Sequence, residues 1–212
     1  MTATWRSVVL ALGSNLGDRQ EILQDAVDAI TRIEGVHVEK VSPLYQTAPV
    51  GGPPQPDYLN AVVLARTTLP SLDLLDRLHE VEAEFDRVRL VRWGPRTLDI
   101  DIITVEGERS DDPALTLPHP RAHERGFVLA PWHDIDQNAV LPGHGPVADL
   151  LKSTELSGIR PARDLRSPRG FGAGIAGGDG GPGEMGGGSP PCKKAAPHIG
   201  GSPGGRPPGE AL

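Results

Sequence analysis

The stretch RWGPRTLDIDII, residues Arg92 to Ile103, places two aspartates inside an apolar run. Leucine and isoleucine alternate with Asp99 and Asp101, as on a strand that buries one face. Side chains two residues apart on a strand point the same way, so the two carboxylates are rooted roughly 6–7 Å apart. The pattern therefore predicts a strand from Thr97 to Val105 with both negative charges on one face.

The segments before this strand alternate between strand and helix patterns. A short apolar run from Ser7 to Leu12, ended by Gly13, predicts a buried strand. A helix is expected next, because Asp18 stands three residues before Glu21 as in a capping box, and apolar residues recur at helical spacing up to Gly35. The chain is therefore expected to open with a strand and a helix.

Two further strands and a second helix are predicted next. Residues His37 to Thr47 predict a strand that Pro43 makes irregular or places at a sheet edge, and Tyr58 to Thr67 predict another. Ser71 is expected to cap a helix whose apolar stripe ends at Phe85. This helix precedes the aspartate strand.

The predicted order is strand, helix, strand, strand, helix, strand. It is the split βαβ arrangement of a ferredoxin-like α+β sandwich, in which helices cover a mainly antiparallel sheet. Residues Leu117 to Ile135 and a short helix near Val147 to Lys152 are expected to cover the other face of the sheet.

Composition divides the chain into two parts. The 212 residues suit one domain with an extension, and from Ser167 onward the chain is rich in glycine and proline and poor in aliphatic residues. Such a segment buries too little apolar surface to offset the entropy of ordering. We therefore expect a folded domain over residues 1–166 and a disordered tail over 167–212. Cys192, the one cysteine, lies in that tail and excludes an intramolecular disulfide.

Charge and hydropathy argue against several classes of partner. A net charge of −7 is unlike that of a general nucleic-acid-binding protein, and no apolar run is long enough to span a bilayer. The N-terminal residues do not show the pattern of a signal peptide. We expect a cytoplasmic monomer without nucleic-acid or membrane partners.

The aspartate pair is a candidate magnesium site. Two like charges beside apolar side chains repel each other and resist desolvation, and a hard divalent cation removes both penalties. Mg²⁺ commonly binds one or two carboxylates together with substrate phosphates. The alternative is that Asp99 and Asp101 are solvated carboxylates on the wet face of the sheet.

Two basic clusters flank the pair in sequence. Arginine suits bidentate phosphate recognition, and positive charge beside a metal site is what a polyphosphate requires. The alternative for the first cluster is a basic surface loop paired with the acidic face around Glu80, Glu82 and Glu84. In the second cluster two histidines alone would leave zinc under-coordinated, so phosphate contacts fit better. The clusters are Arg87, Arg89, Arg92 and Arg96, and His119, Arg121, His123 and Arg125.

Aromatic residues make up only 4% of the chain, and their placement indicates where a flat ligand would bind. Tyr58 and Asn60 end a glycine-proline loop, and Phe127 follows the second basic cluster. Two rings and an amide suit a heteroaromatic ligand, although both rings would equally suit a core. The stretch GSNLGDR, Gly13 to Arg19, lacks a phosphate-binding glycine pattern, so we expect it to be a turn and helix cap.

Four stretches together resemble a known family. They are, in order, ALGSNLGDR, SPLYQTAPVGGPPQPDYLNAVV, RWGPRTLDIDII and LPHPRAHERGFVLAPW. The sequence from Ser7 to about Leu151 is similar to 6-hydroxymethyl-7,8-dihydropterin pyrophosphokinases of folate biosynthesis, and RWGPRTLDIDI is a highly specific motif. The resemblance implies the ferredoxin-like fold and the transfer of pyrophosphate from ATP to the hydroxymethyl oxygen of the pterin, with release of AMP.

The resemblance also implies roles for individual residues. Two Mg²⁺ ions would be held by Asp99 and Asp101, and ATP is the co-substrate. Arg87, Arg96 and Asp101 would be catalytic. The implied nucleotide contacts are Arg89, Ile102, Leu115, Thr116, His119 and Arg125, and the implied pterin contacts are Thr47, Val50, Tyr58, Asn60, Trp93 and Phe127.

One residue departs from the family pattern. Asp86 takes the place of an expected glycine before Arg87, which bears on the mobility and the positive field of that loop.

Two other functions are alternatives to the pyrophosphokinase. A sugar-nucleotide transferase also uses an Asp-x-Asp pair, but it needs a larger nucleotide domain with parallel strands. A binding module without catalysis is the other rival, and the intact aspartates and arginines argue against it.

Overall fold

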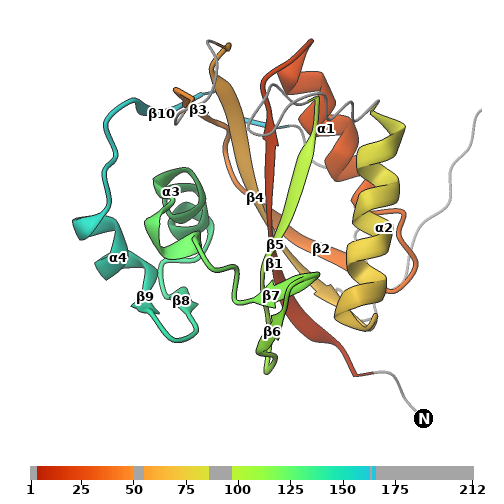
Figure 1. Ribbon diagram of the computed structural model, residues 1–212. Helices are drawn as coiled ribbons and strands as arrows, with labels where there is room; N and C mark the ends of the chain where they lie inside the picture. The colour runs from red at the N-terminus through yellow and green to blue at the C-terminus, as the bar shows by residue number, and fades with distance from the viewer. Residues whose placement is uncertain (1–3, 50–54, 86–96, 163, 166–212) are drawn as a thin grey trace, which may run out of the picture. The chain divides into compact units, whose positions relative to one another are not determined.

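The computed structural model describes residues 4–49, 55–85, 97–162, 164 and 165 of the chain (Figure 1). The chain divides into two units, Met1–Gly172 and Ala173–Leu212, and all described residues belong to the first. The predicted tail and Cys192 therefore lie outside the described residues, and the predicted domain boundary stays a prediction. Among the described residues, no helix combines the length and apolar character needed to cross a membrane.

A six-stranded antiparallel sheet forms the centre of the described unit (Figure 1). Its main order is β10-β3-β4-β1-β5, and β2 pairs with β4 alongside β3. The long strands β1 and β4 pair from Arg6↔Thr67 to Ser14↔Leu59. The predicted antiparallel sheet is confirmed. The bounds are β1 Arg6–Ser14, β2 Val36–Val41, β3 Tyr45–Thr47, β4 Tyr58–Thr67, β5 Asp99–Val105 and β10 Ile159–Pro161.

The predicted irregular strand around Pro43 is two strands, β2 and β3, on the same side of β4. Between β2 and β3, Ser42 makes two hydrogen bonds to Val62 of β4 in place of a regular strand pairing. The Ser42 N–H donates to the Val62 carbonyl, and the Ser42 hydroxyl accepts the Val62 N–H, both at 2.9 Å. The break at Pro43 is confirmed, and it lets β3 run on to meet β10.

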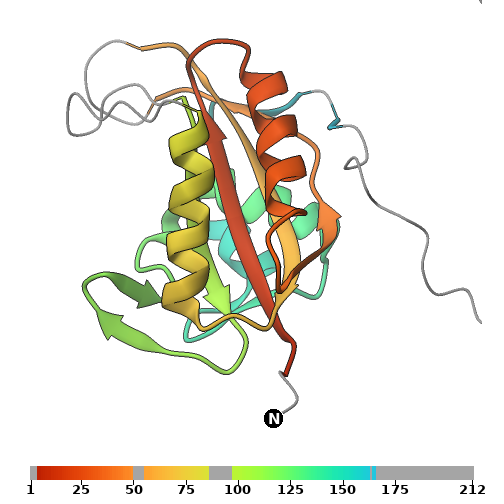
Figure 2. The ribbon, with the colours of Figure 1, turned by 90° about the vertical axis from the view of Figure 1, so that its right-hand side faces the viewer.

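Helices α1 (Arg19–Ile30) and α2 (Ser71–Glu84) cover one face of the sheet (Figure 2). The predicted cap of α1 is confirmed, because an Asp18 carboxylate oxygen accepts the Glu21 N–H at 3.1 Å. The predicted cap of α2 is wrong. Pro70 is the N-cap, and Ser71 is the first helical residue, whose hydroxyl donates to the Glu108 carboxylate at 2.6 Å. A charged acceptor binds a hydroxyl more strongly than a neutral one does.

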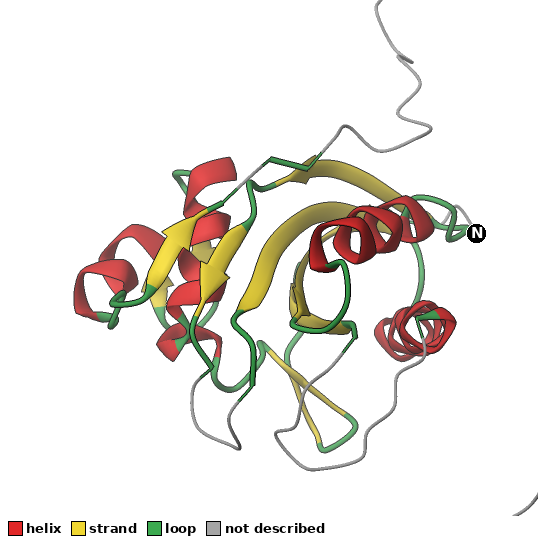
Figure 3. Ribbon diagram, turned by 90° about the horizontal axis from the view of Figure 1, so that it is seen from above, coloured by secondary structure: helices red, strands yellow, loops and turns green. Residues whose placement is uncertain are grey.

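Helix α3 (Gly126–Ile135) lies against the opposite face of the sheet, and α4 (Val147–Ser153) packs against α3 (Figure 3). Val62 and Ile103 of the sheet form a second hydrophobic cluster with Leu129 and Trp132 of α3. The prediction that the later elements cover the other face is confirmed, and the sheet is packed between two helical layers.

Several short elements were not predicted from the sequence. Two hairpins, β6–β7 and β8–β9, and a 3-10 helix, η1, connect the longer elements. Strands of two or three residues are too short to show a period. Their bounds are β6 Ser110–Asp112, β7 Leu115–Leu117, β8 Val140–Leu141, β9 Gly145–Pro146 and η1 Ala122–Glu124.

Candidate active site

A cavity of about 370 Å³ lies where β1, β4 and β5 meet the N-terminus of α3. Both aspartates and both predicted aromatic rings line it, together with residues of the C-terminal segment. Sites of this size and composition are typical of small-molecule binding. The lining includes Gly13, Thr47, Gln55, Tyr58, Asn60, Asp99, Asp101, Arg125, Phe127 and Ile159.

The alternation of β5 places its aspartates in this cavity. Ile100 and Ile102 are 3% exposed and belong to the core beneath α1 and α2, whereas Asp99 and Asp101 are half-buried on the other face. The prediction that the two carboxylates share one face is confirmed. Beside them, the Ile100 N–H donates at 2.9 Å to a carboxylate oxygen of Glu82, a fully buried residue of α2.

A β-bulge in β5 positions a histidine beside Asp101. The register of β1 against β5 shifts so that Ile103 has no partner on β1, and the Ile103 carbonyl instead accepts the His119 N–H at 2.8 Å. This contact helps to hold His119 Nε2 at 3.9 Å from Asp101 Oδ2. A bulge next to a site commonly re-aims a side chain in this way.

The tautomer of His119 follows from its neighbours. Burial lowers the pKa of His119, and Arg125 lowers it further, against the opposing effect of Asp101. The ring is therefore neutral near pH 7. Because its Nδ1 accepts the Arg121 N–H at 3.2 Å, the proton of the neutral ring is on Nε2, the atom nearer to Asp101.

Arg125 is a cationic neighbour of Asp101. Its Nη1 donates to Asp101 Oδ2 at 2.9 Å, and its guanidinium carbon lies 5.6 Å from the centroid of the Phe127 ring. The side chain is 19% exposed, so it has access to the cavity while remaining largely packed. The charge of Asp101 is thus partly compensated by the protein itself.

The other side of the cavity carries the rings and an amide. Asn60 of β4 is buried, and its Nδ2 donates to the Thr47 hydroxyl of β3 at 2.8 Å. Tyr58 and Phe127 are half-buried, and Phe127 also packs partly against the second hydrophobic cluster. The structure therefore brings together Thr47, Tyr58, Asn60 and Phe127, as predicted for a flat ligand.

Some predicted site residues lie elsewhere or outside the described residues. The side chain of Ile102 is in the core, and Leu115 and Thr116 lie on β7, away from the cavity lining. Their nucleotide contacts stay predictions. Val50, Arg87, Arg89, Trp93 and Arg96 lie outside the described residues, so their roles also stay predictions.

The C-terminal wall of the cavity, which Glu155, Ser157 and Ile159 form, was not predicted from the sequence. Strand β10 holds this wall by pairing Ile159 with Thr47. Gly126 permits its close approach, because a Cβ there would lie 2.6 Å from Ile159 Cδ1. No local pattern in this short segment indicates that contact.

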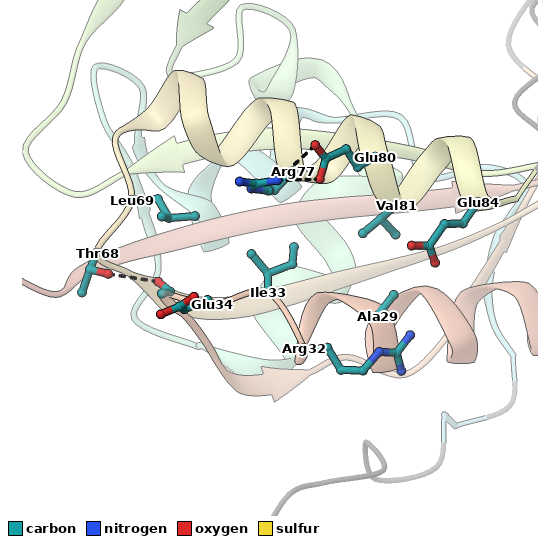
Figure 4. Close-up of a pocket in the computed structure, with 11 residues that line it drawn as sticks. Ala29, Arg32, Ile33, Glu34, Thr68, Leu69, Arg77, Glu80, Val81 and Glu84 are labelled. Atoms are coloured by element: carbon teal, nitrogen blue, oxygen red, sulfur yellow. Dashed lines mark hydrogen bonds and ion pairs between the residues drawn. The ribbon is translucent and has the colours of Figure 1, made fainter.

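A larger groove of about 540 Å³ lies between α1 and α2 (Figure 4). It has an apolar lining from Ala29, Ile33 and Val81, with charged groups around it, and Arg77 is paired with Glu80 at 2.9 Å. The described residues that line it include neither the aspartate pair nor an aromatic ring. The smaller cavity is therefore the better candidate for chemistry.

More than half of the chain is similar to a known protein family. Residues 9–137 match the sequence model of the family described as 7,8-dihydro-6-hydroxymethylpterin-pyrophosphokinase. The chain belongs to this pterin pyrophosphokinase family. The matched segment contains Asp99, Asp101, Tyr58, Asn60 and Phe127.

Relatives within the pterin pyrophosphokinase family match most of their length. The 2-amino-4-hydroxy-6-hydroxymethyldihydropteridine pyrophosphokinase of Haemophilus influenzae is 43% identical over 143 residues, which cover 68% of this chain and 89% of the relative. The protein of the same name from Pseudomonas aeruginosa is 42% identical over 152 residues, covering 72% of this chain and 94% of the relative.

A solved structure shares the fold of this family member. A Plasmodium falciparum HPPK-DHPS triple mutant superposes with a TM-score of 0.56 and 13% sequence identity, covering 71% of this chain and 43% of that protein. The ferredoxin-like α+β fold predicted from the sequence is confirmed.

Proposed function

We propose that this chain transfers pyrophosphate from ATP to the hydroxymethyl group of 6-hydroxymethyl-7,8-dihydropterin. The products are AMP and the pterin diphosphate, an intermediate of folate biosynthesis. One observation carries the proposal: in a member of this family, an aspartate pair and two aromatic rings line the same cavity. A phosphate-transfer site and a flat-ligand site are thereby adjacent.

The pterin would lie between Tyr58 and Phe127. Aromatic rings favour stacked or edge-to-face contact with a heterocycle, which fixes its plane. The bond from Asn60 to Thr47 fixes the orientation of the Asn60 amide, so that its oxygen is left to accept an N–H of the pterin edge. Bound in this way, the pterin would direct its hydroxymethyl arm toward the aspartates.

Asp99 and Asp101 fit Mg²⁺, and we propose that they hold two ions together with ATP. Among the described residues, no group of three or more His, Cys, Asp or Glu is placed to hold a metal. The remaining coordination positions would belong to triphosphate oxygens and water, as is common for Mg²⁺. When bound, the ions supply charge neutralisation for the triphosphate and lower the pKa of the attacking alcohol.

The chain's own residues position the reactants. Arg125 and His119 flank Asp101 and would contact phosphate oxygens, and Arg87 and Arg96 are proposed to add positive charge from the preceding loop. Asp101 is also suited to accept the proton of the hydroxyl. Phosphoryl-transfer catalysis depends mainly on such positioning and charge stabilisation, so in-line attack on the β-phosphorus requires little covalent work from the protein.

The decisive experiment is incubation with ATP, Mg²⁺ and 6-hydroxymethyl-7,8-dihydropterin, followed by mass analysis. The proposal expects the pterin diphosphate, and AMP whose formation depends on both the pterin and Mg²⁺. A binding module would retain the pterin without forming AMP. A sugar-nucleotide transferase would consume a nucleotide sugar and ignore the pterin.

The cytoplasmic location and monomeric state expected from the sequence are also proposals. They are tested by cell fractionation and by size-exclusion chromatography with light scattering.

A further inference from the structure

The end of β1 lies between the part of the cavity that β4 lines and the part that β5 lines. Gly13 pairs with Asn60 of β4 on one side and with Asp99 of β5 on the other. A Cβ at Gly13 would lie 3.1 Å from Asn60 Oδ1 and 4.0 Å from Tyr58 Cδ1. Because Gly13 has no side chain, Asn60 has room beside it. The end of β1 therefore lies close to Asn60 and to the ring of Tyr58.

Asn15 follows two residues later and is 1% exposed. Its Nδ2 donates to the side-chain oxygen of Gln55 at 2.9 Å and to the Pro56 carbonyl at 3.4 Å. The same Gln55 oxygen accepts the Tyr58 hydroxyl at 3.2 Å. One amide oxygen thus joins a buried asparagine to a ring that lines the cavity.

The backbone before Tyr58 is fixed from two further sides. The Arg19 guanidinium donates to the Asp57 carbonyl, and Gln46 of β3 donates to the Asp57 carboxylate at 2.7 Å. The stretch from Gly13 to Arg19 therefore does more than turn the chain and cap α1, because two of its side chains hold residues 55–57.

We infer that Asn15 is a positioning residue for the pterin, acting through Gln55 on the ring of Tyr58. The inference rests on the proposed function, because it assigns the Tyr58 ring to the pterin. A buried donor and its acceptor hold each other in place, since an unmade bond leaves a desolvated polar group. The described link runs from Asn15 through Gln55 to Tyr58, which the proposed function assigns to the pterin, so we expect the effect to fall on pterin binding rather than on ATP.

Asn15→Asp is the sharpest variant, because it keeps the shape of the side chain but removes the donor. If the Gln55 amide turns to donate to the new carboxylate, the Tyr58 hydroxyl meets an NH₂ group and loses the bond that it now donates to the Gln55 oxygen. We expect the KM for the pterin to rise roughly 5- to 10-fold, with the KM for ATP within about twofold of the wild type.

Tyr58→Phe provides the partner in a double-mutant cycle. It keeps the ring and removes the hydroxyl, so it should reproduce most of the rise in pterin KM caused by Asn15→Asp. The combined variant should show less than the product of the two separate effects, because both changes break the same link. Independent, multiplicative effects would overturn the inference.

Thr67→Ala is the matched control for lost stability. Thr67 is fully buried, its hydroxyl accepts the Leu69 N–H at 3.0 Å, and it lies at the opposite end of β4 from Tyr58. It should lower the melting temperature without raising the pterin KM. The inference would be overturned if Thr67→Ala raised the pterin KM as much as Asn15→Asp does, or if Asn15→Asp left the pterin KM unchanged. In either case an active wild type would still support the proposed function. A wild type that neither binds nor converts the pterin would overturn both.

Discussion

Arg125 Nη1 lies 2.9 Å from Asp101 Oδ2, so a residue predicted to bind phosphate is bonded to a residue predicted to bind metal. With a metal and a triphosphate in the cavity, both groups would gain a second partner of opposite charge. The bond between Arg125 and Asp101 is therefore expected to couple phosphate binding at Arg125 to metal binding at Asp101.

Replacing Arg125 by Ala is expected to raise the KM for ATP by about 10- to 100-fold, the range for a lost hydrogen bond to a charged group. The KM for the pterin should change less. Arg125→Lys should recover part of the affinity, because it keeps the charge but loses the planar fork. Initial rates at varied ATP and fixed pterin measure the effect, and an unchanged KM for ATP in Arg125→Ala contradicts the assignment.

Replacing Asp101 by Ala is expected to abolish turnover while leaving the fold intact. A lost metal ligand removes several kcal/mol of transition-state stabilisation, so kcat should fall by about 1,000-fold or more. The side chain is 35% exposed, so its removal leaves no buried cavity. Pterin-dependent AMP formation measures the first effect and thermal melting the second. Full turnover by Asp101→Ala with Mg²⁺ present would exclude the metal role.

Glu82 is expected to stabilise the strand between the aspartates. Glu82→Ala leaves the Ile100 N–H without the carboxylate oxygen that it contacts at 2.9 Å, which should cost roughly 1–3 kcal/mol of unfolding free energy. Glu82→Gln keeps an acceptor and should cost less. Glu80→Ala is the control, because Glu80 lies on the exposed side of the same helix. Urea unfolding of the three variants decides the matter, and equal losses in all three would contradict it.

Local sequence patterns were enough to predict the long helices and strands, and to predict that Asp99 and Asp101 share one face of β5. The alternation in β5 and the cap at Asp18 are encoded by residues within one turn or one strand, so they could be predicted. The missed contacts are not local. Glu82 meets Ile100 across 18 residues and Asn15 meets Gln55 across 40, so neither appears as a period or a motif. Strand β10 pairs with β3, which lies more than 100 residues earlier in the sequence.

Tyr45 links the two walls of the cavity, and its ionisation should affect stability at high pH. Its hydroxyl donates to Asp134 Oδ2 of α3 at 2.6 Å, while its strand β3 carries Thr47. Burial, together with Asp134, raises the pKa of Tyr45 from 10.0 to about 12. Because the folded pKa exceeds the unfolded one, this stabilisation is fully present below pH 10 and is lost as the pH rises from 10 to 12.

Tyr45→Phe should therefore be less stable than the wild type by about 0.5–1.5 kcal/mol at pH 8, the value of a typical hydrogen bond. The difference should shrink above pH 10, because the variant has no hydroxyl to ionise at this position. Urea unfolding at pH 8, 10 and 11 measures both effects, with other titrating groups cancelling between the two proteins. A difference that stays constant over this range would show that the hydroxyl of Tyr45 ionises equally in the folded and unfolded states, contrary to its burial against Asp134.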